Sequence, residues 1–137
     1  MTRPLAATLS AALVWAATVA AHETARQGPT TPASQGVYTK AQARRGAGVF
    51  EDVCLACHTL SRFRGENFTA KWSDKPLAVL YKAVKTMPQG EPESLDPQDY
   101  ADLVAYLLSI NAYPEGGQEL PPSDAAAAAI HLDIKAP

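Results

Sequence analysis

The sequence predicts an all-α domain with three main helices, and two observations lead to that prediction. Apolar residues recur at helical spacing in three stretches, around residues 39–53, 76–85 and 96–108. No convincing strand pattern separates them, and no internal repeat is visible along the 137 residues. That length allows one domain of ordinary size.

The first helix is predicted to begin at Thr39, because Thr39-Lys40-Ala41-Gln42 has the T-x-x-Q form of a capping box. Its apolar residues then follow a helical period: Val49, Phe50 and Val53. Gly46 costs this helix about 1 kcal/mol relative to alanine, so it needs a packing reason. A close crossing by the last helix would provide one.

The middle helix is predicted from a possible cap at Ser73 or Asp74 and from Pro76 in its first turn. Its apolar face consists of Leu77, Leu80, Tyr81 and Val84.

The last helix has Asp96 as its expected cap, Pro97 at its first position and Asn111 at its end. Its apolar stripe consists of Tyr100, Leu103, Val104, Leu107 and Leu108.

The strongest chemical motif is Cys54-Leu55-Ala56-Cys57-His58, which reads C-x-x-C-H, the attachment signal for c-type haem. Each cysteine sulfur can form a thioether with one haem vinyl group, and His58 is then placed to bind the iron as its proximal ligand. The two alternatives are a thioredoxin-like redox pair and half of a zinc site. The first expects a preceding strand, and the second needs four ligands.

Met87 is the candidate for the second axial ligand, with His131, His22 or a lysine as the alternatives. The chain has two methionines, and Met1 should leave with the signal segment. A lone methionine usually fills a core, but Met87 lies in a loop with Pro88 and Gly90 rather than on an apolar helical face. Thioether ligation would raise the reduction potential, and filling both axial positions would leave the iron only a change of oxidation state.

The N-terminal segment has the pattern of a secretory signal. Arg3 is the only charge before Leu5–Ala21, a run of 17 residues without an ionisable group that ends in small residues. We expect cleavage after Ala20 or Ala21, because the run is short for a membrane span. A retained anchor is the alternative. The mature protein is then predicted to be periplasmic and without a stable membrane span.

Charge is unevenly distributed along a chain of net charge −2. Residues 40–85 contain nine Lys/Arg against four Asp/Glu, a net +5, whereas residues 86–134 contain nine Asp/Glu and no Lys or Arg, a net −9. Such asymmetry can orient a protein toward a charged redox partner, although charge runs are usually solvated faces. The acidic balance argues against nucleic-acid binding.

From about Tyr38 to Asn111 the chain resembles the class I cytochromes c, through Gly46…Phe50…Cys54-x-x-Cys57-His58…Met87-Pro88…Leu103-x-x-Tyr106-Leu107. The resemblance implies the cytochrome c fold, in which the first and last helices cross at the glycine, flanked here by Phe50 and Tyr106. It also implies one haem c bound through Cys54 and Cys57, with His58 and Met87 as axial ligands. The stretch from Met87 to Leu108 looks like soluble bacterial monohaem cytochromes in particular, some of which accept electrons from periplasmic dehydrogenases.

Two further expectations come from this resemblance. Trp72 resembles a tryptophan that donates its indole N–H to a haem propionate, and a buried core tryptophan explains the residue equally well. Many relatives carry a proline soon after the motif whose carbonyl orients the proximal histidine, but no proline lies between His58 and Asp74 here. Another backbone carbonyl of that loop is therefore expected to orient the ring.

The predicted organisation is a signal peptide (residues 1–21), a flexible linker (22–37), a cytochrome c domain (38–112) and a C-terminal extension packed on the domain (113–137). In the extension we expect a short helix over 125–130 capped by Ser123, and packing through Ile130, Leu132 and Ile134.

The leading functional hypothesis is a periplasmic electron carrier, not an enzyme, acting between redox protein partners such as a dehydrogenase and an oxidase. One alternative is a dedicated haem subunit of a periplasmic dehydrogenase or sulfur-compound-oxidising complex. Another is a haem sensor or peroxidatic enzyme with an open sixth position. The protein is expected to be a monomer or a subunit of a hetero-complex.

Overall fold

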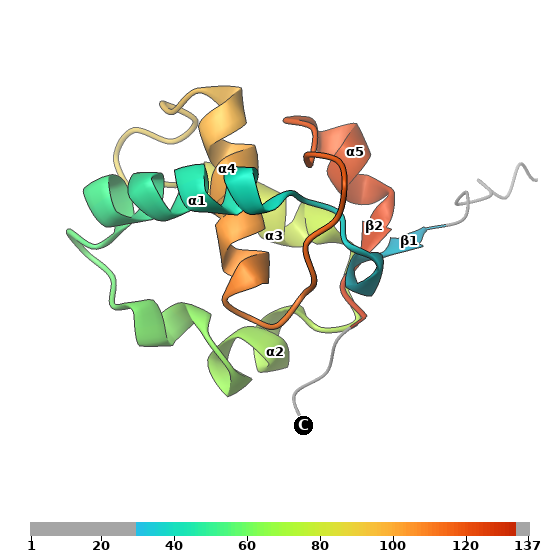
Figure 1. Cartoon of the computed structure of the whole chain (residues 1–137). Helices are drawn as coiled ribbons and strands as arrows, with labels where there is room; N and C mark the ends of the chain where they lie inside the picture. Colours follow the sequence, from blue (N-terminus) through green and yellow to red (C-terminus); the bar gives the residue numbers. More distant parts are fainter. Residues whose placement is uncertain (1–29, 134–137) are drawn as a thin grey trace, which may run out of the picture.

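Helix α4 (Pro97–Ser109) is the central element of the fold, and α1 (Lys40–Val49) crosses it (Figure 1). The computed structural model describes residues 30–133, so the predicted signal segment and Ile134 lie outside the described residues. A π-helical turn, Phe50–Cys54, continues α1, and a 3-10 turn, Leu60–Phe63, follows. The remaining elements are a second 3-10 turn (Ala33–Gln35), α2 (Glu66–Trp72), α3 (Leu77–Lys85), α5 (Asp124–Ala128), and the two-residue strands β1 (Thr31–Pro32) and β2 (Ile130–His131).

The crossing of α1 and α4 occurs at Gly46, as the sequence predicts. A Cβ atom on Gly46 would lie 1.8 Å from the carbonyl oxygen of Asp102, so only a glycine allows the two backbones to approach this closely. Phe50 and Tyr106 pack beside the crossing with ring centroids 5.4 Å apart. The packing reason expected for Gly46 is therefore confirmed.

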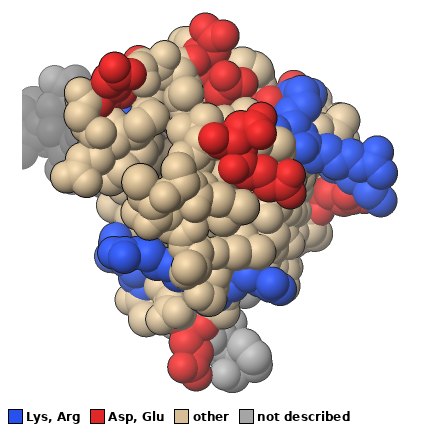
Figure 2. Space-filling model, turned by 90° about the vertical axis from the view of Figure 1, so that its left-hand side faces the viewer, with Lys and Arg blue, Asp and Glu red and all other residues tan. Residues whose placement is uncertain are grey.

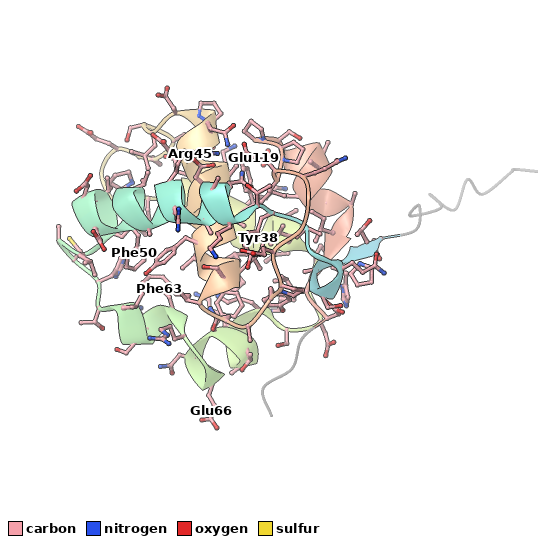
Figure 3. All side chains as sticks on the ribbon, in the orientation of Figure 1. Tyr38, Arg45, Phe50, Phe63, Glu66 and Glu119 are labelled. Carbon is pink, nitrogen blue, oxygen red and sulfur yellow. The ribbon has the colours of Figure 1, made fainter. Side chains whose placement is uncertain are left out.

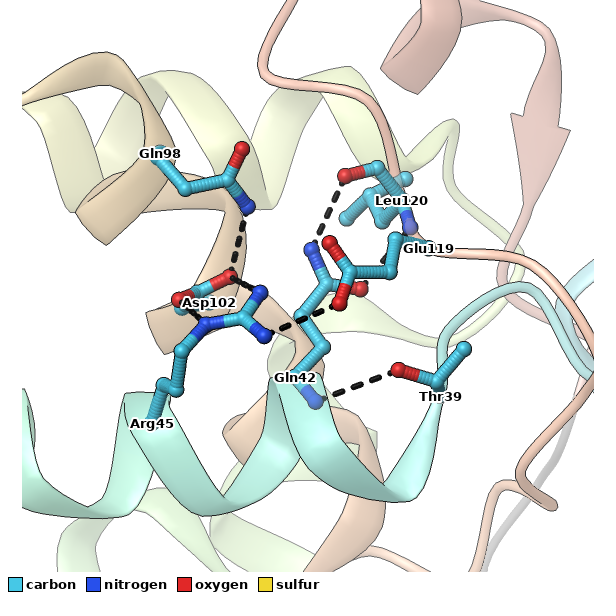
Figure 4. Close-up of polar contacts among 7 residues, drawn as sticks. All are labelled: Thr39, Gln42, Arg45, Gln98, Asp102, Glu119 and Leu120. Carbon is cyan, nitrogen blue, oxygen red and sulfur yellow. Dashed lines mark hydrogen bonds and ion pairs between the residues drawn. The ribbon is translucent and has the colours of Figure 1, made fainter.

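An ion pair between a buried carboxylate and a half-exposed guanidinium joins the same two helices. The carboxylate of Asp102 is 1% exposed and accepts two hydrogen bonds from Arg45, at 2.6 Å from Nε and 2.9 Å from Nη2. Gln98 donates a third hydrogen bond to Asp102, and Arg45 also binds Glu119 of the C-terminal extension (Figure 4). These contacts raise the pKa of Arg45 above its ordinary value, mainly through hydrogen bonds to Asp102 and then Glu119.

The helix starts differ in part from prediction. The Thr39 hydroxyl does cap α1 by accepting from the Gln42 amide, but the Gln42 side chain is buried and bonds to Leu120 of the extension instead of closing the capping box. Helix α3 begins after Pro76, without a cap from Ser73 or Asp74, and Asp96 precedes α4 without a side-chain cap bond. Helix α2, which the sequence reading missed, contributes Phe68 and Trp72 to the core.

The two ends of the described chain are paired with each other. Strands β1 and β2 run parallel, and Ala33 and Leu132 beside them are completely buried. The assignment of residues 31–37 to a flexible linker is therefore wrong, because this segment packs against the C-terminal extension. A segment rich in Pro, Gly and Ser predicts a flexible linker. It does not predict that Ser34 bonds to Asp133, which lies nearly one hundred residues away in sequence.

The C-terminal extension packs on the domain. Ser123 caps α5 as predicted, by accepting from the Ala126 amide, and α5 lies against α3. Leu120, Ala127, Ile130 and Leu132 are buried in the common core. Within residues 30–133, none of the helices has the length and apolarity needed to span a membrane.

Candidate haem-attachment site

The C-x-x-C-H motif forms one tight turn at the end of the helical segment that α1 begins. The amides of Cys57 and His58 both bond to the carbonyl oxygen of Cys54, at 3.2 and 3.0 Å. Both cysteines are free thiols, with Cys54 half-buried and Cys57 exposed. The turn thus presents two thiols and an imidazole within five residues.

The two thiols differ in environment. Burial raises the pKa of the Cys54 thiol above its ordinary value. A thioether forms when a thiol adds its sulfur to one vinyl carbon and its hydrogen to the other. Two free thiols flanking two residues meet that requirement.

Aromatic rings pack beside His58. Its imidazole meets Phe63 edge-on, with ring centroids 5.4 Å apart and an interplanar angle of 82°. Phe63 meets Phe50 in the same way, at 5.4 Å and 87°, and both rings lie between α1 and the Leu60–Phe63 turn (Figure 3). Edge-to-face ring pairs stabilise by about 0.5–1.5 kcal/mol beyond the area they bury. The loop carbonyl that the sequence analysis expects to orient His58 stays a prediction.

Met87 lies in the loop after α3, and its backbone is fixed from both sides. Its amide donates to Val84 at 3.0 Å, and its carbonyl accepts from the hydroxyl of Tyr100 at 2.9 Å. Tyr100 is 2% exposed, whereas the Met87 side chain is 37% exposed and is not part of the core. The sequence predicts Tyr100 only as one apolar residue of a helical stripe, and it does not predict this bond.

Trp72 lies at the end of α2 and is 8% exposed. The ammonium groups of Lys71 and Lys75 lie 4.7 and 5.9 Å from the centroid of its ring. This position suits a buried core tryptophan covered by two cations. A bond from Trp72 to a propionate stays a prediction.

The residues present fit a covalently bound haem better than either alternative. Among residues 30–133, no group of three or more His, Cys, Asp and Glu side chains is arranged to hold a metal ion, which argues against a zinc site. No strand leads into Cys54, because an α-helix and a π-helical turn precede it, and this argues against a thioredoxin-like pair. Two thiols and an imidazole within one turn, beside the rings of Phe50 and Phe63, suit a large apolar ring with an iron centre.

Residues 41–107 match the family described as "Cytochrome C oxidase, cbb3-type, subunit III". Together with the all-α fold, this match supports a class I c-type cytochrome. A cytochrome c domain implies one covalently attached haem c, and an electron carrier rather than a catalytic enzyme. No curated protein and no solved structure shows a significant match to the chain.

The side of the molecule with the motif turn is shown in Figure 2. Acidic side chains gather mainly on its upper half, basic side chains on its right and lower parts, and the centre is largely uncharged. On this face, most acidic and most basic side chains therefore occupy different areas. Arg62 and Arg64 are exposed in and just after the Leu60–Phe63 turn.

Proposed function

We propose that this cytochrome is a periplasmic carrier that moves single electrons on a haem ligated by His58 and Met87. Its donor would be a protein such as a periplasmic dehydrogenase, and its acceptor a protein such as an oxidase. Cys54 and Cys57 hold the haem covalently in this proposal, and Trp72 lies near a propionate.

The observation that carries the proposal is the contrast between the side chain and the backbone of Met87. An apolar side chain that is 37% exposed contributes little to the core. Its carbonyl, however, is held at 2.9 Å by the buried Tyr100. A fixed backbone with a free thioether is the arrangement that a ligand requires.

Filling both axial positions with protein ligands decides the chemistry. When bound, the haem supplies a one-electron iron couple. His58 and Met87 leave no position for substrate or dioxygen, so electrons pass through the exposed edge of the site. The uncharged centre between acidic and basic areas in Figure 2 suits brief docking to a charged partner.

Location in the periplasm is supported by the signal-like N-terminal pattern and by the attachment of c-type haem outside the bacterial cytoplasm. In the proposed organisation, the signal peptide ends near Ala21 and the cytochrome domain near residue 112.

Carbon monoxide binding to the reduced, haem-loaded protein tests whether the sixth position is closed. We expect an unchanged spectrum for the natural protein and a shifted one for Met87→Ala. Leu55→Ala is the matched control for Met87→Ala, because Leu55 is also an exposed apolar residue. This variant should behave like the natural protein. A spectral shift in the natural protein would contradict the carrier proposal and favour a sensor or peroxidatic enzyme.

A second candidate is a dedicated haem subunit of a periplasmic dehydrogenase or sulfur-compound-oxidising complex. The observation in its favour is the family match, because the family's description names a subunit of an oxidase. Purification from the native host in high salt separates the two functions. A carrier should elute alone, whereas a subunit should retain its partner.

A further inference from the structure

The loop that follows the haem motif is fastened to the end of α4 by Asn111. The amide nitrogen of this side chain donates to the carbonyl oxygens of Phe63 and Leu107, both at 2.8 Å. Its amide oxygen accepts from the backbone N–H of Gly65 at 2.9 Å. Asn111 is 7% exposed, so these three bonds form away from bulk water.

An asparagine suits this position chemically. Two of its bonds need a donor and the third needs an acceptor, and a side-chain amide offers both. An aspartate would place a carboxylate against two carbonyl oxygens, and a leucine of similar size would leave all three backbone groups without this partner. The side chain therefore fixes the backbone on both sides of Arg64.

Gly65 shows that the loop has a specific conformation. Its φ of 57° and ψ of −134° lie in a region open to glycine and costly for other residues. The bond from Gly65 to Asn111 holds this turn in place. Phe63 is thus held through its own carbonyl and through the fixed Gly65 turn two residues later.

Phe63 in turn contacts the imidazole of His58. Its ring lies edge-on to His58 and edge-on to Phe50, with centroid distances of 5.4 Å in both pairs. Phe50 is 3% exposed and packs on Tyr106 of α4, so it supports Phe63 from the side of the core. Because Phe63 is held between Phe50 and the imidazole, it restricts rotation of the His58 ring.

We propose that Asn111 and Phe63 are positioning residues for the proximal ligand, with Asn111 fixing the loop and Phe63 setting the plane of the His58 ring. The inference rests on the proposed role of His58 as an axial ligand. It assigns to α4 a function in the site beyond packing, through a residue just after the end of the helix.

The test is a set of variants of the haem-loaded protein, studied by NMR in the ferric state with labelled histidine. Ring signals of an iron ligand are strongly shifted by the unpaired electron and depend on the ring plane. Asn111→Leu and Phe63→Leu should both move the His58 ring signals and change the reduction potential. Phe63→Tyr, which keeps the ring, should restore the natural signals.

Asn67→Leu is the matched control. It removes another bond from an asparagine amide to a loop carbonyl, that of Ser61 at 3.0 Å, and leaves the bonds of Asn111 to Phe63 and Gly65 in place. We expect its His58 signals to match the natural protein. If Asn111 acts through Phe63, adding Asn111→Leu to Phe63→Leu should move the signals little further.

The outcomes are distinguishable. If the two leucine variants melt at lower temperature but keep the natural His58 signals and potential, the residues are merely structural and the inference is wrong. Should Asn111→Leu fail to mature, the comparison of Phe63→Leu with Phe63→Tyr decides the question alone. If the natural protein shows no shifted His58 signals at all, the proposed ligation itself fails, and the inference fails with it.

Discussion

The hydroxyl of Tyr100 donates a hydrogen bond to the carbonyl oxygen of Met87 at 2.9 Å. The same hydroxyl accepts from the amide of Leu95 at 3.3 Å, so one buried side chain holds both ends of the loop 87–95. Asn111 does the same for the loop 63–65 at the opposite end of α4. Helix α4 and the residue just after its end thus anchor the loops that lie next to both proposed iron ligands.

Replacing Tyr100 by phenylalanine should loosen the loop of Met87. Loss of this buried hydroxyl should cost about 1–3 kcal/mol, because the Met87 carbonyl loses a partner. The ferric protein should exchange Met87 for added imidazole more readily than the natural protein does. Titration with imidazole, followed by the absorption spectrum, measures this change.

Tyr38→Phe is the control for that experiment. It removes a buried tyrosine bond to the carbonyl of Tyr113, at 2.6 Å, on the side of the extension. A similar loss of stability with unchanged imidazole affinity is expected. If both variants alter imidazole binding equally, Tyr100 has no specific role at Met87.

Gly46→Ala should strongly destabilise the protein. Its Cβ would lie 1.8 Å from the carbonyl oxygen and 2.4 Å from the carbonyl carbon of Asp102, so α1 and α4 must separate. Such overpacking costs about 1–3 kcal/mol or more. Gly48→Ala in the same helix meets nothing within 4 Å and should stabilise by up to about 1 kcal/mol. Thermal unfolding of the two variants should therefore change in opposite directions.

Gln42→Ala should release the C-terminal extension. The completely buried amide of Gln42 bonds to the N–H and the carbonyl of Leu120, at 2.8 and 2.9 Å. Its loss leaves both backbone groups unpaired and opens a cavity, which together cost about 2–5 kcal/mol. Protease should then cut the segment 114–119 faster. Gln118→Ala, at an exposed position of that segment, should leave the cleavage rate unchanged.

Asp133 should make stability depend on acid pH. Burial acts to raise its pKa, but the hydrogen bonds from the hydroxyl and amide of Ser34 outweigh burial and lower the pKa below the ordinary 3.8. A carboxylate whose pKa is lowered by folding stabilises the protein at pH values above its ordinary pKa. This stabilisation is lost as the pH falls through the lowered pKa of the folded state.

Asp133→Asn should therefore melt below the natural protein at pH 7, and the difference should shrink as the pH falls below about 4. Thermal unfolding between pH 3 and pH 7 measures it. Glu66→Gln on α2 makes the same change of net charge. An equal pH profile for both variants would show that Ser34 has no part in the effect.

The sequence was sufficient to predict those features that depend on local pattern. The three main helices, the crossing at Gly46 and the cap at Ser123 each follow from residue spacing or from one residue's conformational cost. The motif Cys54–His58 predicts a covalent haem in the same way, since its chemistry is contained in five consecutive residues.

The remaining features depend on contacts between distant segments, which a single sequence does not reveal. Gln42 fits a capping box, yet its buried partner is Leu120, 78 positions away. Phe63 follows no periodic pattern, and its contact with His58 arises only from the folded loop. Asn111 is predicted only as the end of a helix. Its one sequence signal is that it is a polar residue directly after an apolar stripe.

The ferric near-infrared absorption spectrum of the haem-loaded protein, compared with that of Met87→Ala, tests the central claim most directly. A thioether bound to ferric iron gives a weak charge-transfer band in this region. The His58 and Met87 ligation proposed here predicts the band in the natural protein and in Leu55→Ala, and its loss in Met87→Ala. A natural protein without the band, or a Met87→Ala variant that keeps it, would contradict the claim that Met87 binds the iron.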